Sequence, residues 1–133
     1  VPIGTSFNDL LDAVGHSENP YKVLSGGPMM GVDVCSVNAS VEKRNNAITV
    51  MKSAKKPPVT ACIRCGRCTS ACPMNLYPAM VESAVTFGNV EQLKELNLNY
   101  CMECGSCSFV CPASRPLTQV MRLAKAELRK ESK

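Results

Sequence analysis

The sequence predicts an α+β protein in two parts, a small mixed segment at residues 1–51 and a mainly α-helical segment at residues 61–133. Three observations lead to this prediction. Eight of the nine cysteines lie in the second segment. Short strand-like runs occur in the first segment, whereas apolar residues at helical spacing fill the second. Within residues 52–60, the pair Lys55-Lys56 is followed directly by two prolines, which favour extended backbone and predict a linker.

The composition of the 133 residues is that of a folded protein, with 45% hydrophobic residues, 20% charged residues and a mean hydropathy of −0.02. No apolar run approaches the roughly 18–20 residues that cross a bilayer, so we expect no transmembrane segment. No secretory signal is visible. The chain opens at Val1 rather than Met, and we expect it to be a piece of a longer protein.

In the first segment, residues 1–4 read as the end of a strand that enters a turn. Thr5 or Ser6 is a suitable N-cap for a short helix that Gly15 ends. Two further strands are predicted at residues 21–24 and 47–51. About fifty residues with so few strands bury little, so we expect the remaining strands of this domain to lie upstream.

Three helices are predicted in the second segment. The first begins at Pro78 and ends at Gly88, the second is capped by Asn89, and the third begins at Pro116. Their apolar faces are predicted to be, in order, Met80, Val81, Ala84 and Phe87; Val90, Leu93 and Leu96; and Leu117, Val120, Met121, Ala124 and Leu128. The other side of the third helix is predicted to be mostly solvated, and carries Arg122, Lys125, Arg129 and Lys130.

The clustered cysteines form an internal repeat. Residues 62–73 read Cys-Ile-Arg-Cys-Gly-Arg-Cys-Thr-Ser-Ala-Cys-Pro, and residues 101–112 read Cys-Met-Glu-Cys-Gly-Ser-Cys-Ser-Phe-Val-Cys-Pro. Both are C-x2-C-x2-C-x3-C-P, the bacterial iron–sulfur spacing. Three cysteines at two-residue gaps wrap a loop around one cube, and Gly66 or Gly105 permits its sharp bend. The repeat therefore predicts two [4Fe–4S] clusters.

The fourth cysteine of each run begins to lead the chain away, so it is better placed to reach the neighbouring cube, as in two-cluster ferredoxins. This predicts one cluster on Cys62, Cys65, Cys68 and Cys111, and the other on Cys101, Cys104, Cys107 and Cys72. Pro73 and Pro112 turn the backbone after the last ligand. Because every ligand position is a cysteine, no iron is open to substrate; we expect electron transfer and assign no catalytic residue.

Other uses of the cysteines fit less well. Structural zinc usually takes two C-x2–4-C hooks, and cysteines two residues apart are poor disulfide partners. A scaffold in which the metal only staples the fold stays open, and reversible reduction of the clusters would exclude it. Cys35 lies outside both runs and is predicted to be a plain thiol.

The net charge of +4 does not predict nucleic-acid binding. Eight thiolates and two cluster cores of about +2 each would bring it to about zero. Arg64 and Arg67 flank the first cluster and Glu103 the second, which at equal exposure predicts that the first is easier to reduce.

Two weaker features have ordinary explanations. His16 is predicted to be solvated. The Gly-Gly-Pro-Met-Met-Gly stretch at residues 26–31 is predicted to be a turn between strands rather than a phosphate loop.

Beyond the cysteines, three stretches extend the pattern, Val-Pro-Ile-Gly-Thr at residues 1–5, Ser-Gly-Gly-Pro-Met-Met-Gly at 25–31 and Arg-Pro-Leu at 115–117. With them, essentially the whole chain resembles the C-terminal part of RnfC, a subunit of the Rnf electron-transport complex. The resemblance implies a partial β-grasp (SLBB-like) domain at residues 1–51 and an α-helical dicluster ferredoxin domain at residues 61–133. It also implies that FMN and NADH bind only to the upstream part of the parent subunit.

The resemblance further implies a setting for the chain. The parent complex couples ferredoxin:NAD oxidoreduction to Na⁺ or H⁺ translocation, and this piece would be its electron relay. Its expected partners are other subunits of the membrane-bound complex and a ferredoxin or flavin-bearing domain, with no nucleic acid. Its expected location is peripheral, on the cytoplasmic side of the membrane. The alternative is the iron–sulfur subunit of a soluble dehydrogenase or heterodisulfide-reductase-like enzyme.

Overall fold

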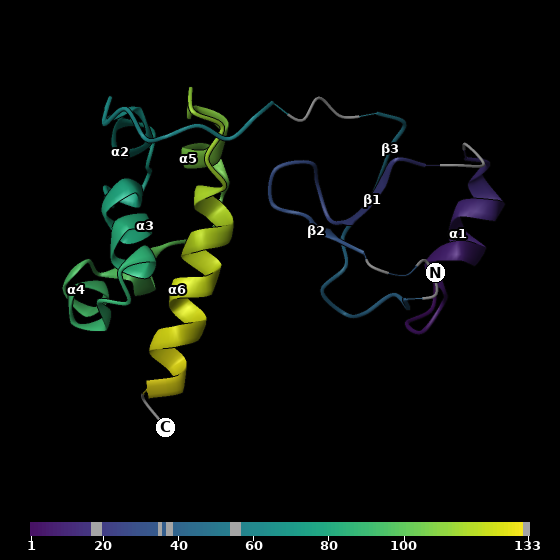
Figure 1. The fold of residues 1–133 in the computed structure, drawn as a ribbon. Helices are drawn as coiled ribbons and strands as arrows, with labels where there is room; N and C mark the ends of the chain where they lie inside the picture. The colour runs from purple at the N-terminus through teal and green to yellow at the C-terminus, as the bar shows by residue number, and fades with distance from the viewer. Residues whose placement is uncertain (17–19, 35, 37–38, 54–56, 132–133) are drawn as a thin grey trace. The chain divides into compact units, whose positions relative to one another are not determined.

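A computed structural model describes residues 1–16, 20–34, 36, 39–53 and 57–131. The chain divides into two compact units, Val1–Lys56 and Pro57–Lys133 (Figure 1). In the described ranges, no helix combines the length and the apolar character needed to span a membrane.

The first unit is a three-stranded antiparallel sheet with one helix, α1 (Phe7–Val14). The strands are β1 (Lys22–Ser25), β2 (Val32–Asp33) and β3 (Ile48–Met51), in the order β2-β1-β3. In the centre of the sheet, Leu24 pairs with Asp33 on one side and with Thr49 on the other. Among its described residues, the buried apolar side chains are few, namely Phe7, Leu11, Val23 and Leu24.

Local signals account for most of the first unit. The Ser6 hydroxyl accepts a hydrogen bond from the Asp9 amide at 3.1 Å, and Gly15 ends α1 with a φ of 68°. Residues 26–31 join β1 to β2, so the turn predicted there is confirmed. Of the strand end and turn predicted at residues 1–4, the turn is confirmed at Ile3 and Gly4, but Val1 and Pro2 form no strand.

The second unit is helical and consists of α2 (Arg67–Ser70), α3 (Pro78–Thr86), α4 (Val90–Glu95), the 3₁₀ helix η1 (Leu98–Tyr100), α5 (Ser106–Phe109) and α6 (Leu117–Glu131). The long helix α6 packs along α3, and α4 and η1 close the same core (Figure 1). That core contains Val81, Ala84, Leu93, Leu98, Met121 and Ala124. The helices predicted from Pro78, Asn89 and Pro116 are confirmed.

The predicted apolar face of α3 is partly wrong. Val81 and Ala84 are buried as expected, but Met80 and Phe87 are 46% and 82% exposed. The charged Glu82 is buried in their place, and its carboxylate binds the Nε of Arg115 at 2.7 Å. Because the ion pair supplies the partner that a buried charge needs, this face of α3 turns toward the start of α6.

Candidate iron–sulfur cluster sites

The two cysteine runs have the same backbone geometry. The residue before the second cysteine is left-handed in both, with φ of 54° at Arg64 and 57° at Glu103. The glycine after that cysteine is also left-handed, at 76° for Gly66 and 87° for Gly105, as the sequence predicted. The left-handed Arg64 and Glu103 were missed, because neither residue type favours this conformation.

Each run then forms one short helix and one turn. The third cysteine lies in α2 in the first run and in α5 in the second. After the fourth cysteine, the Cys72 carbonyl accepts from the Asn75 amide and the Cys111 carbonyl from the Ser114 amide, both at 3.1 Å. Helix α2 packs against α5, so both loops meet at one end of the α3–α6 pair (Figure 1).

The eight cysteines line two separate cavities. The first, of about 550 Å³, is lined by the first cysteine set, which comprises Cys62, Cys65, Cys68 and Cys111. The second, of about 20 Å³, is lined by the second cysteine set, which comprises Cys72, Cys101, Cys104 and Cys107. Each cavity therefore combines three cysteines of one run with the fourth cysteine of the other.

These donors suit a cube better than a single metal ion. In the described ranges, no three His, Cys, Asp or Glu side chains gather closely enough to bind one ion. Zinc would bring sulfurs to about 3.8 Å from one another, given Zn–S bonds of about 2.3 Å, whereas the thiolates of a cube bind four different irons. The first cavity has room for a cube, and the thiols of the smaller second cavity must spread outward to admit one.

Two other residues were considered from the sequence, both in the first unit. Cys35 lies outside the described residues. His16 is half-buried rather than solvated, and it lines a cavity of the first unit with residues of α1 and β3.

Within the described chain, the hydrogen bonds to cysteine sulfur belong to the second set. The Glu103 amide donates to the Sγ of Cys101 and the Leu76 amide to the Sγ of Cys72, both at 3.4 Å. The Cys104 thiol donates to the Ser106 hydroxyl, also at 3.4 Å. Amides that point at ligand sulfur raise the reduction potential of an iron–sulfur cluster.

Two thiols of the second set differ in acidity. Hydrogen bonding with the side chain and the backbone of Ser106 lowers the pKa of the Cys104 thiol below its usual value. Burial raises the pKa of the Cys107 thiol, although a contact with Thr118 partly opposes this. Because a cluster would bind the thiolate, Cys107 would be the harder of these two thiols to ionise before a cluster forms.

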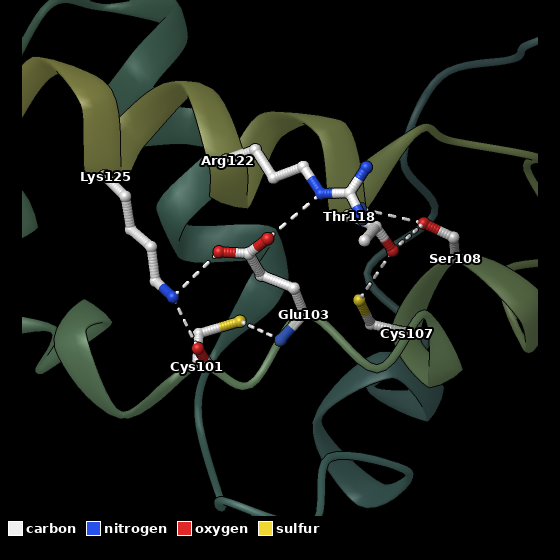
Figure 2. Close-up of polar contacts among 7 residues, drawn as sticks. All are labelled: Cys101, Glu103, Cys107, Ser108, Thr118, Arg122 and Lys125. Carbon is white, nitrogen blue, oxygen red and sulfur yellow. Dashed lines mark hydrogen bonds and ion pairs between the residues drawn. The ribbon is translucent and has the colours of Figure 1, made fainter. Parts of the chain in front are cut away.

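Helix α6 binds the loop of the second run directly (Figure 2). Lys125 and Arg122 contact the Glu103 carboxylate at 2.9 and 3.0 Å, and Lys125 also donates to the Cys101 carbonyl at 2.5 Å. Burial tends to raise the pKa of Glu103, but hydrogen bonds and charge from Lys125 and Arg122 bring it below its usual value. The prediction that this side of α6 is mostly solvated is therefore wrong for Arg122 and Lys125.

A second contact joins α5 to the start of α6. The Ser108 hydroxyl accepts from the Thr118 amide at 2.8 Å and lies 2.8 Å from the Thr118 hydroxyl (Figure 2). Thr118 is in the first turn of α6, where amides lack partners within the helix, so Ser108 satisfies one of them. This pair was not predicted from the sequence, because its two residues are ten positions apart and carry no charge.

The chain resembles known proteins along its whole length. Residues 61–114 match the family model of the 4Fe-4S dicluster domain. The C subunit of the ion-translocating oxidoreductase complex of Rhodobacter capsulatus is 40% identical over 131 residues, which are 96% of this chain and 25% of that protein.

Two further relatives have more specific names. The C subunit of the proton-translocating ferredoxin:NAD(+) oxidoreductase complex of Clostridium ljungdahlii is 43% identical over 97% of this chain and 29% of its own length. The C subunit of the Na(+)-translocating ferredoxin:NAD(+) oxidoreductase complex of Acetobacterium woodii is 40% identical over 96% of this chain and 30% of its own. The chain thus spans less than a third of the length of these three relatives, and it belongs to the RnfC family, the C subunits of ion-translocating oxidoreductase complexes.

Proposed function

We propose that residues 61–133 relay electrons between two [4Fe–4S] clusters inside an ion-translocating ferredoxin:NAD oxidoreductase complex. The observation that carries this proposal is the lining of the two cavities, each with three cysteines of one run and the fourth of the other. The match to the dicluster family model and the names of the relatives support the same proposal.

In this proposal the first cysteine set holds one cluster and the second set the other. The clusters, when bound, accept and release single electrons. The chain contributes the thiolates and keeps the two sites adjacent, because α2 packs against α5 and each run serves both sites. With four cysteines at each site, no ligand position is left for a substrate, so these two sites would transfer electrons rather than bind a substrate at iron.

The first cluster is the one better placed to exchange electrons with another protein. Cys62 and Cys65 are exposed, whereas the cysteines of the second set are half-buried. Arg64 and Arg67, the first residue of α2, are also exposed in this cysteine run. Because electron transfer needs close approach, an exposed cysteine run suits exchange with a partner protein. The positive charge of the two arginines would favour a partner surface with acidic side chains.

We further propose that residues 1–51 are part of a β-grasp (SLBB-like) domain, with residues 52–60 as linker. The described part of the first unit has a three-stranded sheet and one helix, α1. A cavity of about 830 Å³ in this unit is lined by residues that include the apolar side chains of Leu10, Val14, Ile48 and Val50. A strand from upstream would fill such a space. The upstream part would also carry the FMN and NADH sites, and the subunit would lie peripherally on the cytoplasmic side of the membrane.

Anaerobic loading of the chain with iron and sulfide tests the relay. We expect about eight irons and eight sulfides per chain, and reversible reduction by dithionite seen as EPR signals of two clusters. Bound zinc or about four irons would contradict the proposal. Clusters that dithionite does not reduce would indicate that the metal has only a structural role. Co-purification of the whole subunit with integral membrane proteins would separate this function from that of a soluble dehydrogenase subunit.

A further inference from the structure

Three side chains connect α6 to the loop of the second cysteine run. Both oxygens of the Glu103 carboxylate are used, Oε1 by the Nζ of Lys125 and Oε2 by the Nε of Arg122 (Figure 2). Lys125 reaches a second point of the loop, the carbonyl of Cys101. Two cations on successive turns of one helix thus fix the loop at Cys101 and at Glu103, on both sides of Met102.

These contacts are partly shielded from water. The side chain of Lys125 is 15% exposed, and those of Arg122 and Glu103 are each 30% exposed. Exposed ion pairs contribute little because solvent screens them and the side chains lose freedom. Paired, charge-assisted hydrogen bonds from an already ordered helix hold geometry better.

The backbone of the loop gives a reason for such anchoring. Glu103 has a φ of 57°, a left-handed conformation that is unfavourable for residues other than glycine. The same residue lies between the ligands Cys101 and Cys104, and its amide donates to the Sγ of Cys101. A change at Glu103 therefore moves a ligand sulfur and its hydrogen bond together.

The first run lacks this arrangement. When Cys62 is aligned with Cys101, Arg64 takes the place of Glu103, and the short neutral side chains of Ser83 and Thr86 take those of Arg122 and Lys125. Arg64 is exposed, and in the described ranges no ion pair involves it. The connection to the long helix is therefore a property of the second run.

We propose that Glu103, Arg122 and Lys125 form a clamp that positions the second cysteine loop for its cluster. The proposal rests on the ligand sets proposed above. The three residues are positioning residues, since they act through the backbone of Cys101 and Glu103. Loss of the clamp loosens the second cluster and leaves the first as it was.

Iron release to a chelator, measured anaerobically on the loaded full chain, tests the clamp. In Lys125→Met and Glu103→Ala we expect about half of the iron to leave roughly 10–100-fold faster, the usual effect of losing a residue that supports a metal ligand. The EPR signal of only one reduced cluster should change. The double variant should be little worse than either single variant, because both break the same contact. Lys125→Arg, which keeps the cation, should restore slow release.

Two variants serve as matched controls. Lys130→Met makes the same change on an exposed part of α6, and Arg64→Ala removes the residue equivalent to Glu103. Release at the parent rate from Lys125→Met and Glu103→Ala, or equal acceleration from both clusters, would overturn the clamp. If Glu103→Ala takes up no cluster, Lys125→Met alone decides. A parent chain that does not hold about eight irons would instead contradict the proposed function.

Discussion

Arg115, two residues before α6, donates from its Nε to the carboxylate of Glu82 in α3, at 2.7 Å, and its Nη1 donates to the carbonyl of Thr60 at 3.0 Å. The Thr60 amide in turn donates to the carbonyl of Ala113. One guanidinium therefore joins three segments beside the first cysteine cavity, which both Arg115 and Glu82 line.

Removing this guanidinium should destabilise the second unit. The Glu82 side chain is 9% exposed. In Arg115→Met the Glu82 carboxylate would therefore remain buried without its ion-pair partner. We expect a loss of about 2–3 kcal/mol, at the low end for a broken buried pair because Arg115 is itself 27% exposed. Differential scanning calorimetry of the loaded chain should show a lower melting temperature.

Neutralising both partners provides the control for that experiment. The double variant Arg115→Met, Glu82→Gln should recover part of the lost stability, since no unpaired charge remains. A single variant that melts at the parent temperature would show that the pair does not hold α3 to α6.

The glycine of the first run should be needed for its backbone rather than for its size. Gly66 has a φ of 76°, and a Cβ built there meets nothing within 4 Å. As far as contacts within the chain are concerned, Gly66→Ala should therefore cost the strain of the left-handed backbone, about 1–2 kcal/mol. This predicts iron release from the first cluster that is about 5–30-fold faster, measured by chelation. Gly27→Ala is the control, because a Cβ at Gly27 also meets nothing within 4 Å but its φ is not left-handed. This variant should release iron at the parent rate.

Local signals predicted the elements, and non-local contacts produced the errors. Ser6 and Asn89 cap helices by binding an amide three residues on, and the cysteine spacing fixes each loop. By contrast, the buried face of α3 depends on Arg115, which lies far along the chain from Glu82. The two-residue strand β2 was missed because both its residues are exposed and the run is too short to show a pattern.

The clamp shows the same limit at the site. The sequence placed Arg122 and Lys125 on a solvated side of α6 because helical periodicity reports only which side faces the core. It treated Glu103 as an isolated negative charge beside the second cluster. The structure pairs that charge with two cations, and it leaves Cys62 and Cys65 more exposed than the second set. The equal exposure assumed in ranking the two potentials therefore does not hold.

Charge near each cluster should still shift its own potential. Arg64→Gln removes an exposed positive charge from the loop of the first cluster, so its potential should fall, by on the order of 10–40 mV for a one-electron couple. Potentiometric titration followed by EPR measures this shift. The shift should shrink at high salt, because solvent ions screen an exposed charge. An unchanged first potential, or a change confined to the second cluster, would contradict the assignment of Arg64 to the first site.

The crossed ligand sets are the central claim, and paired cysteine variants test them most directly. Iron and sulfide are counted in two double variants loaded under the same anaerobic conditions. If Cys65 and Cys111 serve one cluster, Cys65→Ser, Cys111→Ser should keep about four irons in an intact second cluster. Cys65→Ser, Cys72→Ser should then damage both clusters and keep fewer. The reverse result, with the second cluster surviving in Cys65→Ser, Cys72→Ser alone, would show that each run holds its own cube.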